Sequence, residues 1–233
     1  MTATARVRTL LFDVLGTVVH EAGSIADQTA AALDAAGADP ARGAVLAADW
    51  TRRTEALISQ VAAGEAPWRP NDAIRRAALL DAVQAAGLHG LPAAVLDDLA
   101  MAGHRLAPWP DSAPALHALG RSRIVIALSN ASLAQLAQMS AIGGLAWHGV
   151  LSGELARAYK PDPAVYQLAI DLLSLDPAET MMVAAHPWDL RAAAAHGLRT
   201  AYVDRPGEGA PEPGDQFDLR ARDLADLAVL LPG

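Results

Sequence analysis

The sequence predicts an α/β protein in which a parallel β-sheet is interrupted, after its first strand, by an all-helical insertion. Over residues 111–233 short aliphatic strand candidates alternate with helical segments, an order typical of a parallel sheet with helices on both faces. Over residues 20–108 four helical stretches follow one another without a convincing strand. We therefore expect a core domain formed by residues 1–19 and 109–233, and a cap subdomain formed by residues 20–108 above its active site.

The expected strands are short and rich in β-branched and aliphatic side chains, as in sheets that are buried on both faces. They cover residues 7–14, 123–130, 149–152, 180–186 and 199–204. Asp111 and Asp162 stand at expected helix starts, and the helix after Asp162 should place Val165, Ala169 and Leu172 on one side. Because such sheets bind ligands at the carboxyl ends of their strands, the active site is expected there.

The expected cap helices have Gly near their ends and apolar residues at helical spacing. They cover residues 24–38, 45–64, 71–87 and 91–106. In the second of them Trp50, Leu57 and Val61 share one face, whereas Arg52 and Arg53 point elsewhere. Apart from a Pro/Gly-rich loop over residues 205–216, which precedes the last helix, the chain shows no low-complexity linker and no repeat.

The composition excludes several classes of function. The formal net charge of -8 disfavours binding to nucleic acid or to an anionic membrane, because phosphate contacts require clustered cations. The absence of Cys excludes a disulfide scaffold, a thiolate zinc site and a Cys nucleophile, and it is typical of a reducing compartment. No apolar run reaches membrane-spanning length, and the opening MTATARVRTLLFDV lacks the apolar core of a secretory signal. We therefore predict a soluble cytoplasmic protein.

The cationic residues are used unevenly. Of the 18 Lys and Arg residues, 17 are Arg, and the single Lys is Lys160. This Lys is either a chance choice on a surface loop or a sign that the site requires a compact ammonium, which a planar guanidinium cannot replace. Lys160 is therefore a candidate site residue.

Four polar signals fall at predicted strand ends or just after them: Asp13, the pair Ser129-Asn130, Lys160 and Asp189. Each has an ordinary structural explanation when taken alone, because Asp and Ser-Asn are common in turns and a carboxylate in a first helical turn complements the helix dipole. In a parallel sheet, however, strand ends that are distant in sequence meet at one edge. Their joint arrangement indicates an active site.

The segments that carry these residues resemble the four successive motifs of the haloacid dehalogenase superfamily. The segments are FDVLGT, LSNAS, AYKPDPAVYQLAIDLLSLDPAE and MMVAAHPWDLRAAAAHGLRTAYV. The resemblance covers nearly the whole chain, is strongest over residues 123–206, and is closer to the type II (S)-2-haloacid dehalogenases than to the phosphatases. It implies a Rossmann-like core with an inserted helical cap, no metal or other cofactor, a small anionic organic acid as substrate, and a homodimer.

The residue type at position 15 distinguishes between two activities found in this superfamily, phosphate hydrolysis and carbon–halide cleavage. A phosphatase of this type needs a second carboxylate two residues after the nucleophile, and acidic Mg²⁺ ligands near the fourth motif. Here the first position is Leu15, and the fourth motif reads Ala184-Ala185-His186 before Asp189. A halide leaves as a stable anion and needs no proton, so an apolar wall at Leu15 suits carbon–halide cleavage. The phosphonate-cleaving relatives need a cap lysine, and residues 20–108 contain none.

The resemblance also implies a role for each motif residue. Asp13 is the expected nucleophile, Lys160 the cation beside it, and Asp189 the group that orients Lys160 and the hydrolytic water. Thr17 and Ser129 are expected to form hydrogen bonds nearby. The expected catalytic set is Asp13, Thr17, Ser129, Asn130, Lys160 and Asp189, and the expected substrate-binding set is Leu15, Arg52, Tyr166, His186 and Trp188.

The cap departs from the family pattern. Relatives usually carry an Arg directly after the cap Trp, where this chain has Thr51; Arg52 and Arg53 follow, each turned on the helix by about 100° per residue. His186 is either a catalytic group or a histidine that closes a strand end. We predict metal-independent hydrolysis of short 2-haloacids through an Asp13 ester. The alternatives are a phosphatase-like hydrolase of the same fold and a catalytically weak small-acid binding protein.

Overall fold

Six parallel strands form one sheet in the computed structural model, which describes residues 7–231. They are β1 (Thr9–Phe12), β2 (Ile124–Ser129), β3 (Gly149–Ser152), β4 (Thr180–Ala184), β5 (Arg199–Val203) and β6 (Leu219–Ala221), in the order β3-β2-β1-β4-β5-β6. β1 lies between β2 and β4, with Phe12 opposite Ala127 and Val183. The strand order reverses between β1 and β4, and doubly wound sheets bind ligands at the carboxyl end of that reversal.

Helices cover both faces of the sheet because successive side chains of a strand point to opposite sides. The face that contains Leu10 and Phe12 packs against α5 (Ser112–Leu119), α6 (Leu133–Gly143) and α9 (Leu224–Leu230). The face that contains Leu11 packs against α7 (Pro163–Leu172) and α8 (Pro187–Ala195). The short 3-10 helices are η2 (Pro40–Arg42), η3 (Ala102–Arg105), η4 (Gly153–Leu155) and η5 (Pro177–Glu179). This arrangement is the Rossmann-like α/β architecture that the sequence predicts.

The structure corrects some of the predicted strand bounds. β1, β2, β4 and β5 are each shorter than predicted by one or two residues at one or both ends, whereas β3 has the predicted bounds. Strand β6 was not predicted, because three residues at the edge of the sheet are too few to show an alternating pattern. Residues 1–6 and 232–233 of the predicted core lie outside the described residues.

One expectation about the core helices is wrong. Helix α7 has Val165, Ala169 and Leu172 on one side, as predicted, although Leu172, its last residue, is 59% exposed. Asp111 precedes α5 without capping it, since its carboxylate accepts hydrogen bonds from Arg205 and from the backbone N–H of Leu224 instead. The other expected helix cap, Asp162, accepts a hydrogen bond from the backbone N–H of Ala164 at 2.8 Å. Of the two predicted helix caps, the one at Asp162 therefore forms, whereas the carboxylate of Asp111 binds distant residues instead.

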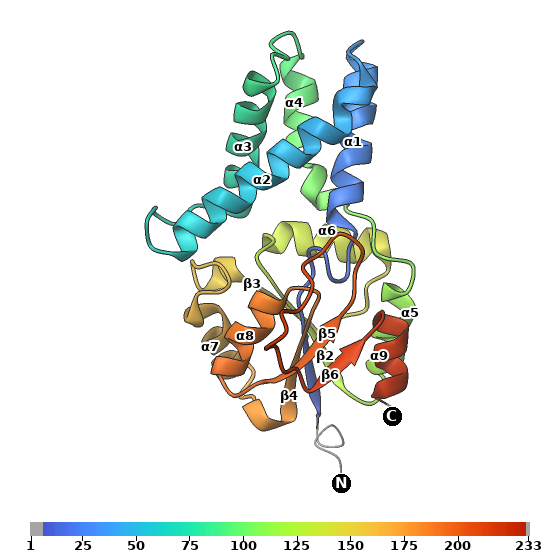
Figure 1. The fold of residues 1–233 in the computed structure, drawn as a ribbon, viewed down its shortest axis with the longest axis vertical. Helices are drawn as coiled ribbons and strands as arrows, with labels where there is room; N and C mark the ends of the chain where they lie inside the picture. Colours follow the sequence, from blue (N-terminus) through green and yellow to red (C-terminus); the bar gives the residue numbers. More distant parts are fainter. Residues whose placement is uncertain (1–6, 232–233) are drawn as a thin grey trace.

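The insertion after β1 stands above the carboxyl end of the sheet as a group of helices (Figure 1). These are α1 (Glu21–Ala35), α2 (Gly43–Ala62), α3 (Asn71–Ala85) and α4 (Ala93–Ala100). Trp50 of α2 is fully buried, and its indole Nε1–H donates a hydrogen bond of 2.8 Å to the carbonyl of Arg75 in α3. A bridge between Val19 and Pro108 closes the base of the insertion, beside the domain boundaries that we propose at residues 19/20 and 108/109.

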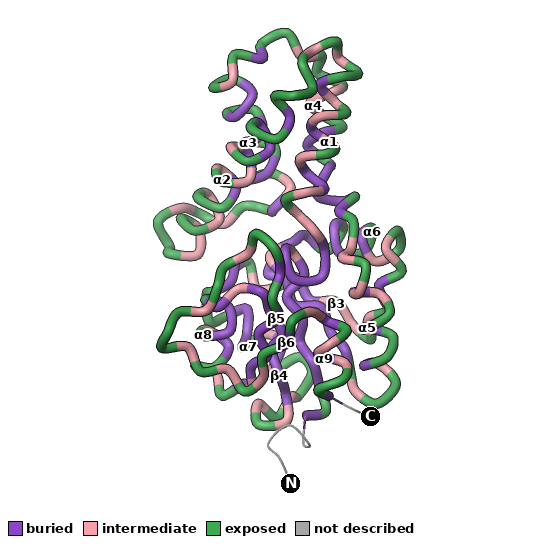
Figure 2. The backbone as a smooth tube through the Cα atoms, turned by 45° about the vertical axis from the view of Figure 1, so that its right-hand side comes forward, coloured by how far each residue is buried: buried purple, intermediate pink, exposed green. Residues whose placement is uncertain are grey.

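Polar and aromatic contacts join the cap to the core. Asp72 of α3 accepts a hydrogen bond from the Ser132 hydroxyl, which also caps α6, at 3.1 Å. The rings of His20 and Trp109 stack with centroids 4.1 Å apart. Figure 2 shows buried residues concentrated in the sheet and at the foot of the cap, with more exposed residues toward the cap's tip. Among residues 7–231, no helix has the length and apolar character needed to cross a membrane.

Candidate active site

Asp13, the residue after β1, is the centre of the candidate site. Its backbone N–H donates to the carbonyl of Val183 at 3.0 Å, so strand pairing fixes where the side chain leaves the sheet. The carboxylate is buried, and its Oδ2 lies 2.7 Å from the Thr17 hydroxyl and 2.9 Å from Nδ1 of His186. Oδ1 accepts a hydrogen bond from Lys160 Nζ at 3.2 Å. Two short contacts therefore engage one oxygen, and a single longer one engages the other.

The turn after Asp13 is held by side chains from distant parts of the core. Trp109 Nε1–H donates to the carbonyl of Gly16 at 3.0 Å, and Arg205 Nε–H donates to the carbonyl of Thr17 at 2.9 Å. Gly16 has φ +77°, a conformation that favours glycine, and a Cβ atom there would lie 2.7 Å from the Glu208 carboxylate. Glycine at position 16 therefore allows the turn to keep the Thr17 hydroxyl on Asp13 without backbone strain and with Glu208 in its place.

Lys160 lies between two carboxylates. Its Nζ donates to Asp189 Oδ2 at 2.7 Å and to Asp13 Oδ1 at 3.2 Å, and all three side chains are buried. Burial alone would lower the pKa of Lys160, but the charges of Asp13 and Asp189 raise it above its ordinary value. Burial would raise the pKa of Asp13, yet Lys160 and His186 hold it well below its usual range. Asp13 is thus ionised, as a carboxylate nucleophile must be.

The residues at the end of β2 act on the backbone rather than on Asp13. Asn130 accepts a hydrogen bond from the Lys160 N–H at 2.7 Å and donates one to the Lys160 carbonyl at 3.3 Å. The Ser129 hydroxyl is buried and accepts a hydrogen bond from the backbone N–H of Ala131 at 3.1 Å. Asn130 therefore places the chain from which Lys160 extends, and Ser129 shapes the turn that carries Asn130.

Asp189 lies behind Lys160, in the first turn of α8. Its Oδ1 accepts a hydrogen bond from the Tyr166 hydroxyl at 2.6 Å, while Oδ2 accepts one from Lys160. Burial raises the pKa of Asp189; Lys160 opposes this shift and the charge of Asp13 supports it. Burial and the Asp189 charge also raise the pKa of Tyr166, so its hydroxyl remains a donor. Tyr166 supports Asp189 from within the core and is not among the residues that line the cleft.

His186, at the end of β4, lies between two carboxylates. Its Nδ1 is 2.9 Å from Asp13 Oδ2, and its Nε2 is 3.0 Å from Glu208 Oε2. Burial alone would lower the pKa of His186, but the hydrogen bonds and charges of Asp13 and Glu208 raise it to about 10. At neutral pH the ring is therefore an imidazolium that donates from both nitrogens. Glu208 was not predicted, because a carboxylate in an irregular Pro/Gly-rich loop carries no periodic signal.

A cleft of about 860 Å³ separates these residues from the cap. Its core side includes the carboxylate of Asp13, the apolar side chain of Leu15, and Trp188, whose ring centroid is 5.6 Å from that of His186. Its cap side includes Glu21, Thr51, Arg52, Glu55 and Arg75. In the part of the chain that is described, no group of three or more His, Asp or Glu side chains could hold a metal ion.

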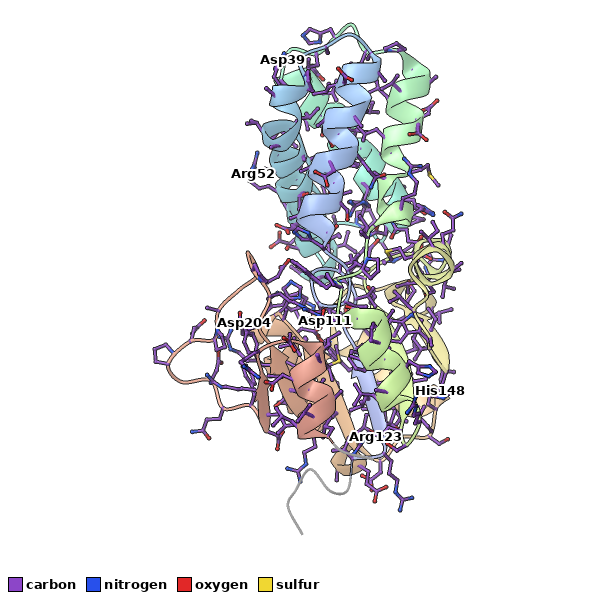
Figure 3. All side chains as sticks on the ribbon, turned by 90° about the vertical axis from the view of Figure 1, so that its right-hand side faces the viewer. Asp39, Arg52, Asp111, Arg123, His148 and Asp204 are labelled. Carbon is purple, nitrogen blue, oxygen red and sulfur yellow. The ribbon has the colours of Figure 1, made fainter. Side chains whose placement is uncertain are left out.

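The cap cations that line the cleft are already paired within the cap. Arg52 has 67% of its side chain exposed, forms an ion pair with Asp49, and projects outward from the cap helices in Figure 3. Arg75 is buried, and its Nη1 donates to Glu21 Oε1 at 2.7 Å. Burial and the charge of Glu21 raise the pKa of Glu55. Arg75, Glu21 and Glu55 were missed because the cap showed only helical periodicity and no motif.

Comparison with known proteins identifies the family. The profile of the haloacid dehalogenase-like hydrolases matches residues 7–197. The (S)-2-haloacid dehalogenase of Xanthobacter autotrophicus is 30% identical over 201 residues, which cover 85% of this chain and 76% of that protein. For (S)-2-haloacid dehalogenase 4A of Burkholderia cepacia, also 30% identical, the match covers 58% of this chain and 59% of that protein. The crystal structure of a defluorinating L-2-haloacid dehalogenase has a TM-score of 0.90 and 34% identity, covering 97% of this chain and 95% of that one. The chain belongs to the haloacid dehalogenase-like hydrolases.

Proposed function

We propose that the protein hydrolyses short 2-haloacids and releases halide through an ester formed on Asp13. The observation that carries this proposal is an ionised, buried Asp13 that is held by Lys160 and His186 and opens onto a cleft beside Leu15. The relatives named as (S)-2-haloacid and L-2-haloacid dehalogenases support this substrate class. Lys160 and His186 place two cations against Asp13, which offset the repulsion between its carboxylate and an anionic organic acid.

In the first step Asp13 displaces the halide. A lone pair on Asp13 Oδ1 forms a bond to carbon 2 of the acid while the carbon–halogen bond breaks, and the halide leaves with the bonding electrons. We assign the attack to Oδ1 because Thr17 and His186 both engage Oδ2. The leaving halide needs no proton donor, and Leu15 gives it an apolar surrounding.

In the second step water hydrolyses the ester. Water oxygen bonds to Cγ of Asp13 while its proton passes through Lys160 Nζ to Asp189, which is buried behind that ammonium. The tetrahedral intermediate then releases the alkoxide of the 2-hydroxyacid, which takes a proton from Lys160, and Lys160 regains its proton from Asp189. Asp13 regains a carboxyl group, which ionises. One oxygen of the new carboxylate comes from water, so single turnover in ¹⁸O-water should add label to Asp13.

The test is halide release from chloroacetate and from (S)-2-chloropropanoate. Asp13→Asn should lower the rate by about 10⁴-fold or more, because an amide is a poor nucleophile. Asp27→Asn, the same change at an exposed position on α1, should leave the rate unchanged. Absence of halide release by the wild type with both acids, or equal release by Asp13→Asn, contradicts the proposal.

The assembly and location that we propose are a homodimer and the cytoplasm. The absence of Cys supports a reducing compartment, and the resemblance to the type II dehalogenases supports the dimer. Light scattering on the purified protein tests the dimer: a mass equal to one chain contradicts it.

A further inference from the structure

The loop that carries Glu208 is attached to the nucleophile's own turn. Arg205 is buried, donates to the carbonyl of Thr17 at 2.9 Å and pairs with Asp111 at 3.0 Å. The backbone N–H of Glu208 donates to the carbonyl of Arg205 at 3.1 Å, which closes a turn in which Gly207 has φ +87°. The position of the Glu208 side chain therefore follows that of the turn after Asp13.

The Glu208 carboxylate occupies a restricted place beside the nucleophile. Its oxygens and Cδ lie where a Cβ on Gly16 would come within 2.7–2.9 Å. From there Oε2 contacts His186 Nε2 at 3.0 Å, and the side chains of Glu208 and His186 are only 18% and 20% exposed. Glu208, His186 and Asp13 thus form a continuous chain of contacts that ends on Asp13 Oδ2.

Esterification changes what His186 faces. In the free enzyme two carboxylates share its ring, Asp13 on Nδ1 and Glu208 on Nε2. Once Asp13 is an ester it carries no charge, and burial then favours a neutral ring. The other charged groups near His186 are Glu55, across the cleft on α2, and Lys160, which contacts Asp13 from the opposite oxygen. Glu208 is therefore the anionic contact that stays with the ring during hydrolysis.

We propose that Glu208 is a positioning residue for ester hydrolysis, which keeps both ring protons on His186 and its Nδ1–H aimed at Asp13 Oδ2. This inference rests on the proposed function. After attack by Oδ1, Oδ2 is the ester carbonyl oxygen, and negative charge develops on it when water adds to Cγ. Thr17 and His186, at 2.7 and 2.9 Å, are preorganised donors to that oxygen. Glu208 thus serves the second step and not the first.

Glu208→Gln tests this separation of the two steps, with Glu212→Gln as the matched control. Glu212 lies in the same loop, has 73% of its side chain exposed and pairs with Arg191. In rapid-quench single turnovers with (S)-2-chloropropanoate, Glu208→Gln should release halide within about threefold of the wild-type rate. It should form hydroxyacid roughly 10- to 100-fold more slowly, because the donor to Oδ2 loses its charge. The ester should therefore accumulate on the protein and be visible by intact mass, and the alkaline limb of kcat should move to lower pH.

A double mutant shows whether Glu208 acts through His186. In a His186→Asn background, Glu208→Gln should cause no further loss of the hydrolytic rate. Two results overturn the inference: hydroxyacid formation by Glu208→Gln at the wild-type rate, or an equal loss of both steps with no accumulated ester. Circular dichroism and the Tm establish that each variant is folded. Failure of the wild type itself to release halide contradicts the proposed function and is distinguishable from either result.

Discussion

The two sides of the cleft differ in how their charges are engaged. On the core side one buried network runs from Asp189 through Lys160 and Asp13 to His186. On the cap side the charges form separate pairs within the cap, as in the buried contact between Arg75 and Glu21. The core charges therefore depend on one another around Asp13, whereas the cap arginines that line the cleft, Arg52 and Arg75, are paired before a substrate binds. We therefore propose that the core carries the chemistry and that the cap sets the shape and access of the cleft.

The largest effect is expected from breaking the core network at its cation. Lys160→Met leaves Asp13 and Asp189 buried without their shared ammonium, which should lower the free energy of unfolding by about 3–5 kcal/mol. Urea unfolding at pH 7 measures this change. Arg76→Met, which breaks an exposed cap pair with Asp97, should cost less than about 1 kcal/mol. Equal losses in the two variants would contradict the contrast between core and cap.

An intermediate effect is expected on the pH dependence of stability. The pKa of His186 is raised from 6.5 to about 10 in the folded protein, so the folded state binds this proton more tightly than the unfolded state. The resulting stabilisation is fully present below about pH 6.5 and is lost as pH rises through about 10. Between about pH 6.5 and 10, the slope of the unfolding free energy against pH reflects the proton that the folded state holds on His186. In His186→Asn this contribution, equivalent to at most about one bound proton, should disappear. Urea unfolding at several pH values between about 6.5 and 10 measures this slope, and an unchanged slope in His186→Asn contradicts the prediction.

The smallest effects are expected on the cap side. Thr51 lines the cleft, so Thr51→Arg adds a cation there and should lower KM for a haloacid by roughly 3- to 10-fold with little change in kcat. Arg52 is largely exposed and paired with Asp49, so Arg52→Gln should change KM by less than about twofold. Steady-state kinetics of both variants measure these changes. A large rise in KM for Arg52→Gln would show that the cap contributes a substrate-binding charge of its own.

The same contrast explains what could be predicted from the sequence. Asp13 and Asn130 follow strands, and Asp189 starts the helix after another, so the geometry of a parallel sheet is enough to bring them together. Lys160 was marked by its residue type, as the single lysine among arginines. Thr51 stands where the family pattern has an arginine, so the sequence showed that this cation is missing. It did not show which other residue supplies a positive charge, because that depends on contacts between side chains of separate helices.

The parts that escaped prediction depend on long-range contacts. Glu208 lies in an irregular loop and reaches His186 only because Arg205 attaches that loop to Thr17, 188 residues earlier in the chain. Asp111 has the local signature of a helix cap, yet Arg205 takes its carboxylate. Neither contact can be predicted from hydrophobic periodicity, secondary-structure propensity or motif spacing, because these patterns each describe a single segment of the chain.

Lys160 gives the protein an internal reporter. It is the chain's single lysine, and only 1% of its side chain is exposed. An amine-reactive reagent therefore has one side-chain target, and it can reach that target only when the site opens. The labelling rate of Lys160 then measures how often the native molecule opens, with no engineered probe, and an acid that fills the cleft should slow that labelling.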